Sequence, residues 1–166
     1  MRQEVIIFEG NEKDHLSAIL RMRLDLERHM AKSNPGYWIS DEKSYLESCQ
    51  RYLNNKDVKV HLACLQGTEQ IIGMGISVIE YHEDFSIKIT GNIHHLWVDP
   101  EYRKKNVGKA IVTEIIKFFK HREVEELILD YSHGNIEAER FWSKLGYTPS
   151  IIMCSNTIKN IETKLS

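Results

Sequence analysis

The stretch from residue 93 to residue 129 constrains the fold of this chain more than any other. It starts with apolar residues at strand-like spacing that end at Asp99-Pro100, and the basic run RKKNVGK follows. From about Val107 to Arg122 the apolar residues fall on one helical face, and 127–129 is a short apolar run typical of a buried strand. This order predicts helices packed on a sheet.

The rest of the chain predicts further elements around that stretch. Apolar spacing and turn residues indicate strands at 4–8, 58–66, 71–79 and 151–154, and helices at 11–31, 40–53 and 135–145. Ser40 and Asn135 are the expected N-caps, and Gly146 is the expected stop of the last helix. Two glycines within 71–79 predict a bulge or a close backbone approach. Residues 80–90 fit a loop or a strand extension, and the tail fits a strand or a helix.

The length and net charge of the chain narrow the range of possible functions. A chain of 166 residues favours one domain, 1–166, with a core that needs no disulfides or metals. The 22 basic and 24 acidic residues nearly cancel to a net charge of −2, which argues against a nucleic-acid partner. No apolar run approaches the roughly 20 residues of a membrane span, and the N-terminus lacks a signal-peptide pattern. We therefore expect no membrane partner and a cytoplasmic location.

The cysteines and histidines predict neither a disulfide framework nor a metal cofactor. Cys49, Cys64 and Cys154 are odd in number and far apart, which fits a reducing compartment. Cys64 and Cys154 fit buried strand positions, and Cys49 fits a helix. The histidines show no metal-ligand spacing. None of the cysteines has the context of a nucleophile.

The basic run can bind an anion. Backbone N–H groups at a strand–loop–helix junction can converge on a phosphate, and the helix dipole adds positive potential at the same place. Gly108 allows close approach, and Asn106 tolerates left-handed backbone. The residues that supply positive charge are Arg103, Lys104, Lys105 and Lys109. A solvated basic turn is the alternative. A Walker phosphate loop is excluded, because Arg103 and Ala110 stand where it needs Gly and Ser or Thr.

Two motifs resemble the GNAT-type N-acetyltransferase superfamily. The segment VDPEYRKKNVGKA is similar to its acetyl-CoA loop, R/Q-x-x-G-x-G/A, with Asn106 in place of the first glycine. The segment NIEAERFWSKLGY, from Asn135 to Tyr147, is similar to the family run N-x-x-A-x-x-F-Y-x-x-x-G-F. The two motifs lie about 30 residues apart, and the order of predicted elements matches across nearly the whole chain.

The resemblance implies a fold and a cofactor. The fold is α/β (α+β), a single-domain GNAT-like fold with a mixed sheet of about six or seven strands and about four helices. Its two central parallel strands, near 93–98 and 127–131, splay apart to hold the pantetheine arm of acetyl-CoA. The residues implied in cofactor binding are Leu96, Trp97, Val98, Arg103, Lys104, Lys105, Asn106, Val107, Gly108, Lys109, Asn135, Phe141 and Trp142.

The implied reaction is acetyl transfer from the thioester to an amine, which must first lose a proton. His94 is the expected base or water-holder, because alternation places it on the strand face of Leu96 and Val98, whereas His95 should point the other way. Glu80, Glu83 and Asp84 are rival bases. The backbone N–H of Val98 is the expected oxyanion donor.

The family's proton donor to the thiolate is often a Tyr, and Trp142 occupies that place here. Trp142 cannot act as an acid and is expected to pack against the cofactor arm. Tyr131 and Tyr147 are alternative donors, and solvent is a third.

The acceptor is the component of the implied reaction that the sequence specifies least. Tyr37, Trp38, Tyr81 and His82 are candidates for lining its site, although each can instead close the edge of the core. The expected partner is a small-molecule or peptide amine, and the resemblance also admits a homodimer. A non-catalytic acyl-CoA-binding or regulatory module is the alternative function, which the replacements at Asn106 and Trp142 favour.

Overall fold

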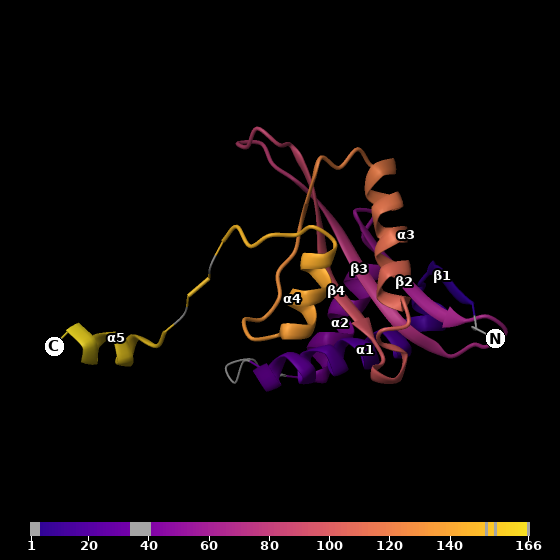
Figure 1. Cartoon of the computed structure of the whole chain (residues 1–166), viewed down its shortest axis with the longest axis horizontal. Coiled ribbons are helices and arrows are strands. Elements are labelled where there is room, and N and C mark those ends of the chain that lie inside the picture. Colours follow the sequence, from indigo (N-terminus) through magenta and orange to yellow (C-terminus); the bar gives the residue numbers. More distant parts are fainter. Residues whose placement is uncertain (1–3, 34–40, 152, 155, 166) are drawn as a thin grey trace. The chain divides into compact units, whose positions relative to one another are not determined.

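The computed structural model describes residues 4–33, 41–151, 153–154 and 156–165. They divide into two compact units, Met1–Gly134 and Asn135–Ser166. The first unit holds a sheet with its helices (Figure 1), and its elements are β1 Val5–Glu9, α1 Glu12–Ser33, α2 Glu42–Leu53, β2 Val58–Leu65, β3 Ile71–Tyr81, β4 Ile89–Val98, a 3-10 turn Pro100–Tyr102, α3 Val107–His121 and β5 Glu126–Ile128. The second unit holds α4 Ile136–Lys144 and α5 Ile158–Leu165.

The sheet is mixed, as predicted. Its strand order is β1-β2-β3-β4-β5; the first four strands pair antiparallel, and β4 pairs parallel with β5. The helix α3 makes the crossover between the two parallel strands. None of the described helices combines the length and apolar character of a membrane span.

The predicted number of elements is wrong in detail. The described residues form five strands and five α-helices, where six or seven strands and about four helices were expected. The expected strand at 151–154 is missing, because its described residues pair with no strand. Ile151 and Met153 are 87% and 95% exposed, and Cys154 is exposed rather than buried. Apolar composition predicted a strand there, yet a strand also needs a neighbouring edge to pair with. The tail beyond it forms α5.

The two faces of the sheet are covered by different helices. Side chains alternate along β3, so Met74 and Ile76 pack with Ile19 and Met22 of α1 and Cys49 of α2. Gly73 and Gly75 face the other way, toward α3. A Cβ at Gly75 would lie only 2.5 Å from Cγ2 of Ile111.

The predicted close approach at these glycines is therefore confirmed. Gly91 of β4 repeats it, because a Cβ there would lie 2.8 Å from the ring of Phe119. The helix α3 thus lies against bare backbone at both ends of its length.

Side-chain caps define where helices begin. Asn11 accepts a hydrogen bond from the backbone N–H of Asp14, at 2.8 Å, at the start of α1. Asp41, not Ser40, is the N-cap of α2, because its carboxylate accepts from the N–H groups of Lys43 and Ser44. Ser40 itself lies outside the described residues.

The segment 80–90 is in part a strand extension. The β3–β4 ladder continues to the pair Tyr81↔Ile89, so both strands are longer than the apolar pattern alone predicts.

A buried histidine makes the fold sensitive to acid. His61 of β2 is only 5% exposed, and its Nδ1 has no hydrogen-bond partner in the described residues. Burial, and then the nearby Lys59 charge, lower the pKa of His61 to about 4. In the unfolded chain this pKa returns to about 6.5, so unfolding takes up a proton between about pH 6.5 and pH 4.

The neutral form of His61 should therefore contribute fully to the free energy of unfolding above pH 6.5. As the pH falls below 6.5, we expect this contribution to decrease by about 1.4 kcal/mol per pH unit. His61→Leu should flatten the fall in the free energy of unfolding between pH 6.5 and 5 by that amount, measured by urea denaturation. His121→Leu, at an exposed position, is the control. Identical pH slopes for wild type and His61→Leu would contradict the assignment.

Candidate functional site

The two parallel strands diverge after a short contact. The β4–β5 ladder contains only the pairs Thr90↔Glu126, Gly91↔Leu127 and Asn92↔Ile128. The strand β4 continues for six residues beyond Asn92, to Val98. From Ile93 onward, β5 therefore does not pair with β4, and the edge of β4 that faces away from β3 has no neighbouring strand among the described residues.

The backbone of β4 presents hydrogen-bonding groups along this open edge. The N–H of Asp99 donates to the carbonyl of Ile72 at 2.9 Å, and Val98 lies opposite Gly73. Because bonding direction alternates along an antiparallel strand, the N–H and C=O groups of Leu96 and Val98 point away from β3. The Val98 carbonyl accepts from Nε of Arg103 at 3.0 Å. The Val98 N–H points to the same open side, where the predicted oxyanion donor is needed.

A bulge in β4 changes where the two histidines point. Ile76 pairs with His95 and Ser77 pairs with Ile93, so His94 is an extra residue without an opposite partner. His95 lies on the face opposite to Leu96 and Val98, as predicted, but His94 lies on the same face as His95, so the prediction that His94 shares the face of Leu96 and Val98 is wrong. The Tyr52 hydroxyl lies 3.4 Å from Nδ1 of His94 and 3.4 Å from Nε2 of His95. Simple alternation fails here because a bulge adds one residue to one strand only.

His94 retains access to solvent and an acidic neighbour. Its side chain is 32% exposed, and its Nε2 lies 3.6 Å from the carboxylate of Glu80. Glu80, a rival base, is thus placed beside His94, whereas Glu83 and Asp84 lie exposed in the following loop. These positions make His94 and Glu80 neighbours in one polar group on β3 and β4.

The surroundings of His95 favour its neutral form. Burial, and then the charges of Arg23 and His94, lower the pKa of His95 to about 3. It can therefore hold the Tyr52 hydroxyl in place without carrying charge at neutral pH.

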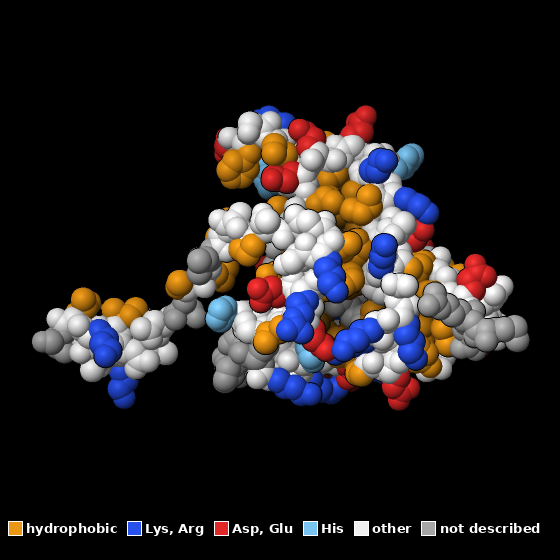
Figure 2. Space-filling model, in the orientation of Figure 1, with side chains coloured by type: hydrophobic (Ala, Val, Ile, Leu, Met, Phe, Trp, Pro, Cys, Tyr) orange, Lys and Arg blue, Asp and Glu red, His pale blue; other side chains and the backbone are white. Residues whose placement is uncertain are grey.

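The basic loop has the backbone geometry of an anion nest. Lys104 and Asn106 adopt left-handed backbone, with φ of 60° and 67°, and α3 begins directly at Val107. The left-handed geometry expected of Asn106 is confirmed. Lys104, Lys105 and Lys109 are exposed, and Figure 2 shows Lys and Arg side chains gathered on the face where α3 begins.

Arg103 is different from the lysines, because it is tied to the end of β4. Its guanidinium lies 4.6 Å from the ring centroid of Trp97. The indole N–H of Trp97 donates to Asp99 at 3.0 Å, and Arg21 of α1 bonds both oxygens of Asp99 at 3.0 and 3.1 Å. This network fixes the junction between β4 and the loop.

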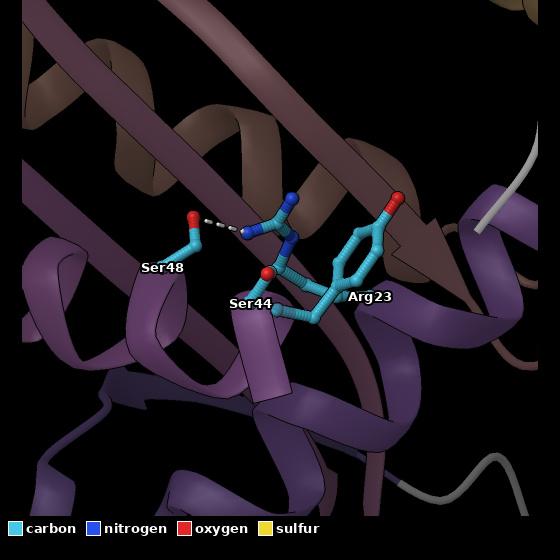
Figure 3. Close-up of a pocket in the computed structure, with 4 residues that line it drawn as sticks. Arg23, Ser44 and Ser48 are labelled. Carbon is cyan, nitrogen blue, oxygen red and sulfur yellow. Dashed lines mark hydrogen bonds between the residues drawn. The ribbon is translucent and has the colours of Figure 1, made fainter. Parts of the chain in front are cut away.

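A shallow cavity of about 250 Å³, wide open to solvent, lies between α1 and α2. It is lined by Arg23, Ser44, Tyr45 and Ser48, and Figure 3 shows Arg23 reaching toward Ser48. Nη1 of Arg23 donates to Oγ of Ser48 at 2.9 Å.

Sequence reasoning missed Arg23 and Tyr52. Both lie in helices read only for their apolar spacing, and the one available signal was that Arg23 and Glu27 fall one turn apart on the apolar face of α1.

Other predicted residues lie elsewhere. The Tyr81 hydroxyl donates to Asp57 at 3.2 Å and accepts from Arg122 at 3.2 Å. Tyr81 belongs to the last pair of the β3–β4 ladder, at the opposite end from Val98. His82 hydrogen-bonds Thr90. The structure therefore does not bring Tyr81 or His82 to His94. Tyr37 and Trp38 lie outside the described residues.

Tyr131, the first candidate acid, lies half-buried in the loop after β5. Its role as proton donor stays a prediction.

The second predicted motif lies in the second unit. Oδ1 of Asn135 caps α4 by accepting from the N–H of Ala138 at 3.2 Å, as expected. The Trp142 ring packs edge-on against Phe141 and Tyr147, with centroids 4.8 and 5.4 Å apart. Burial raises the pKa of Tyr147, so this phenol stays protonated. Gly146 has a φ of 90°, consistent with its predicted role as a helix stop.

Comparisons with known proteins agree with the geometry. A family model described as the Acetyltransferase (GNAT) family matches residues 24–147. A curated relative, the glucosamine 6-phosphate N-acetyltransferase of Trypanosoma brucei brucei, is 29% identical over 84 residues, which are 51% of this chain and 55% of the relative. The chain thus matches about half the length of that relative.

Solved structures share the fold. An aminoglycoside N-acetyltransferase in complex with CoA is 16% identical, with a TM-score of 0.75 over 95% of this chain and 97% of that one. A mutant protein from Bacillus halodurans is 20% identical, with a TM-score of 0.81 over 92% of this chain and 99% of that one.

Proposed function

The chain belongs to the GNAT acetyltransferase family, and on that basis we propose that it transfers an acetyl group from acetyl-CoA to a primary amine. The observation that carries the proposal is the open edge of β4, which is followed, after the 3-10 turn, by the nest of Lys104 and Asn106. An extended pantetheine arm can pair with the backbone of Leu96 and Val98, and a pyrophosphate can bind the N–H groups where α3 begins. The expected loop contacts are Arg103, Lys104, Lys105, Asn106, Val107, Gly108 and Lys109.

The same proposal assigns the chemical steps. His94 accepts the amine proton, directly or through water, and the amine nitrogen then attacks the thioester carbon. The Val98 N–H donates to the oxyanion. The nitrogen of the tetrahedral intermediate then loses its second proton to solvent, and the C–S bond breaks while the new C–N bond remains. The thiolate takes a proton from Tyr131, Tyr147 or solvent, and a tyrosine donor recovers its proton from solvent. No covalent enzyme intermediate is needed.

The resemblance of the second motif extends the proposal to three further cofactor-binding residues. Asn135, Phe141 and Trp142 belong to the second motif, and the family model runs across the boundary between the units. We therefore propose that residues 1–166 act as one acetyltransferase domain, in the cytoplasm. The relatives' names support a small amine, such as an amino sugar or an aminoglycoside, as acceptor.

Calorimetric titration with acetyl-CoA, and with CoA alongside, tests the proposal. We expect micromolar binding of both, followed by release of free thiol when amino sugars, aminoglycosides, polyamines and peptide N-termini are screened. Tight cofactor binding with no acetylated amine would favour the non-catalytic acyl-CoA-binding module. No binding of either ligand would overturn the proposal.

A further inference from the structure

An arginine is buried beside the cavity between α1 and α2 with its charge only partly satisfied. Arg23 is 6% exposed, and its Nε has no hydrogen-bond partner in the described residues. Its ion-pair partner Glu27 lies 3.9 Å from Nη2, beyond hydrogen-bond distance. Oε2 of Glu27 also lacks a partner there, and burial raises the pKa of this carboxyl while Arg23 lowers it. A buried guanidinium is stable when all its donors are used, so this one is short of an acceptor.

Two aromatic rings and a serine surround the Arg23 guanidinium beside the cavity. The rings of Tyr45 and Tyr52 lie 5.2 and 5.3 Å from its central carbon and hold its plane. Ser48 accepts the bond from Nη1, so its own hydroxyl proton remains to be donated to a ligand oxygen. Arg23 and Ser48 are thus two hydrogen-bond donors that line one cavity of about 250 Å³. Planar donors of this kind match carboxylate and phosphate oxygens.

The cavity is one side chain away from the predicted base. Tyr52 stacks on Arg23 through its ring and contacts both His94 and His95 through its hydroxyl. Tyr52 therefore links the cavity to His94 through direct contacts.

We propose that the cavity lined by Arg23 and Ser48 binds the carboxylate or phosphate group of the acceptor, so that the acceptor is an amine carrying an anionic group. This inference rests on the proposed acetyl transfer, whose residues it uses. It names the acceptor's charge and the residues that recognise it.

Matched acceptors test the inference. We would measure kcat/KM for ω-amino acids against their amides, and for aminoalkyl phosphates against the corresponding amino alcohols. The anionic member of at least one pair should be preferred by 10-fold or more. A preference in the first pair indicates a carboxylate, and one in the second a phosphate.

Variants then assign the preference to the cavity. The preference for the anionic acceptor should disappear in Arg23→Gln, and kcat/KM for that acceptor should fall roughly 30-fold or more. The matched control is Arg28→Gln, because Arg28 lies on the same helix, is exposed and pairs with Asp25. Ser48→Ala removes one donor from the half-buried wall of the cavity and should halve the preference or more, which keeps the test decisive if Arg23→Gln does not fold.

The two hypotheses fail in different ways. Acetylation of amines with no preference for the anionic member, or with a preference that survives in both Arg23→Gln and Ser48→Ala, overturns the anion site alone. An independent readout is a thermal shift by acetate and by inorganic phosphate, with CoA present to occupy the basic loop. A shift lost in Ser48→Ala, with no amine acetylated, supports the anion site and contradicts the proposed acetyl transfer.

Discussion

Gly108→Glu should weaken acetyl-CoA binding by 100-fold or more. Gly108 is the second residue of α3, where the N–H groups following the left-handed Asn106 converge. A glutamate there adds a side chain and a negative charge where a pyrophosphate is expected, and like charges at an interface cost several kcal/mol. The measurement is the Kd from calorimetric titration.

The variant should remain folded, which makes the result decisive. Glutamate forms helix better than glycine, and an acidic side chain in the first turn interacts well with the helix dipole. Its melting temperature should equal or exceed that of wild type. Thr113→Glu, exposed and further along α3, is the charge control and should bind acetyl-CoA normally. Wild-type affinity in Gly108→Glu would remove the loop from the cofactor site.

The second large effect is expected from His94→Gln, which should lower kcat about 100-fold once an acceptor is known. Glutamine keeps the volume and the hydrogen bonding near Tyr52 and Glu80 but cannot carry a proton at neutral pH. The KM for acetyl-CoA should be unchanged, and the acid limb of the pH profile of kcat/KM should disappear.

His95→Gln separates proton transfer from positioning. The pKa of His95 is lowered to about 3, so this imidazole stays neutral across the assay range. Its loss should change kcat through Tyr52 while the acid limb remains. Turnover by His94→Gln at the wild-type rate would exclude His94 as the base and leave Glu80, 3.6 Å away, as the alternative.

The sequence predicted most of the fold because its local signals agree with the final packing. The helix α3 was expected to span about 107–122 and spans Val107–His121, since its apolar stripe faces the sheet. The strand 151–154 was wrong because an apolar run does not reveal whether an edge is free to pair with it. The longer β3 and β4 depend on cross-strand pairing, which composition does not encode.

The sequence predicted only the part of the candidate site that depends on local backbone geometry. The motif around Asn106 indicated the loop, because left-handed backbone restricts the residue type at that position. The bulge at His94 and the stacking of Arg23 on Tyr52 join residues from different elements. A periodicity argument treats each element alone and therefore misses such contacts.

The glycines beneath α3 divide the first unit into a fixed part and an adaptable part. At Gly73, Gly75 and Gly91 the helix touches sheet backbone, so it has no compressible layer through which to slide or tilt. The basic loop is attached to the first turn of this helix and inherits its fixed position. The helices α1 and α2 instead contact the sheet through side chains, so this side of the first unit can repack while the position of the basic loop stays unchanged.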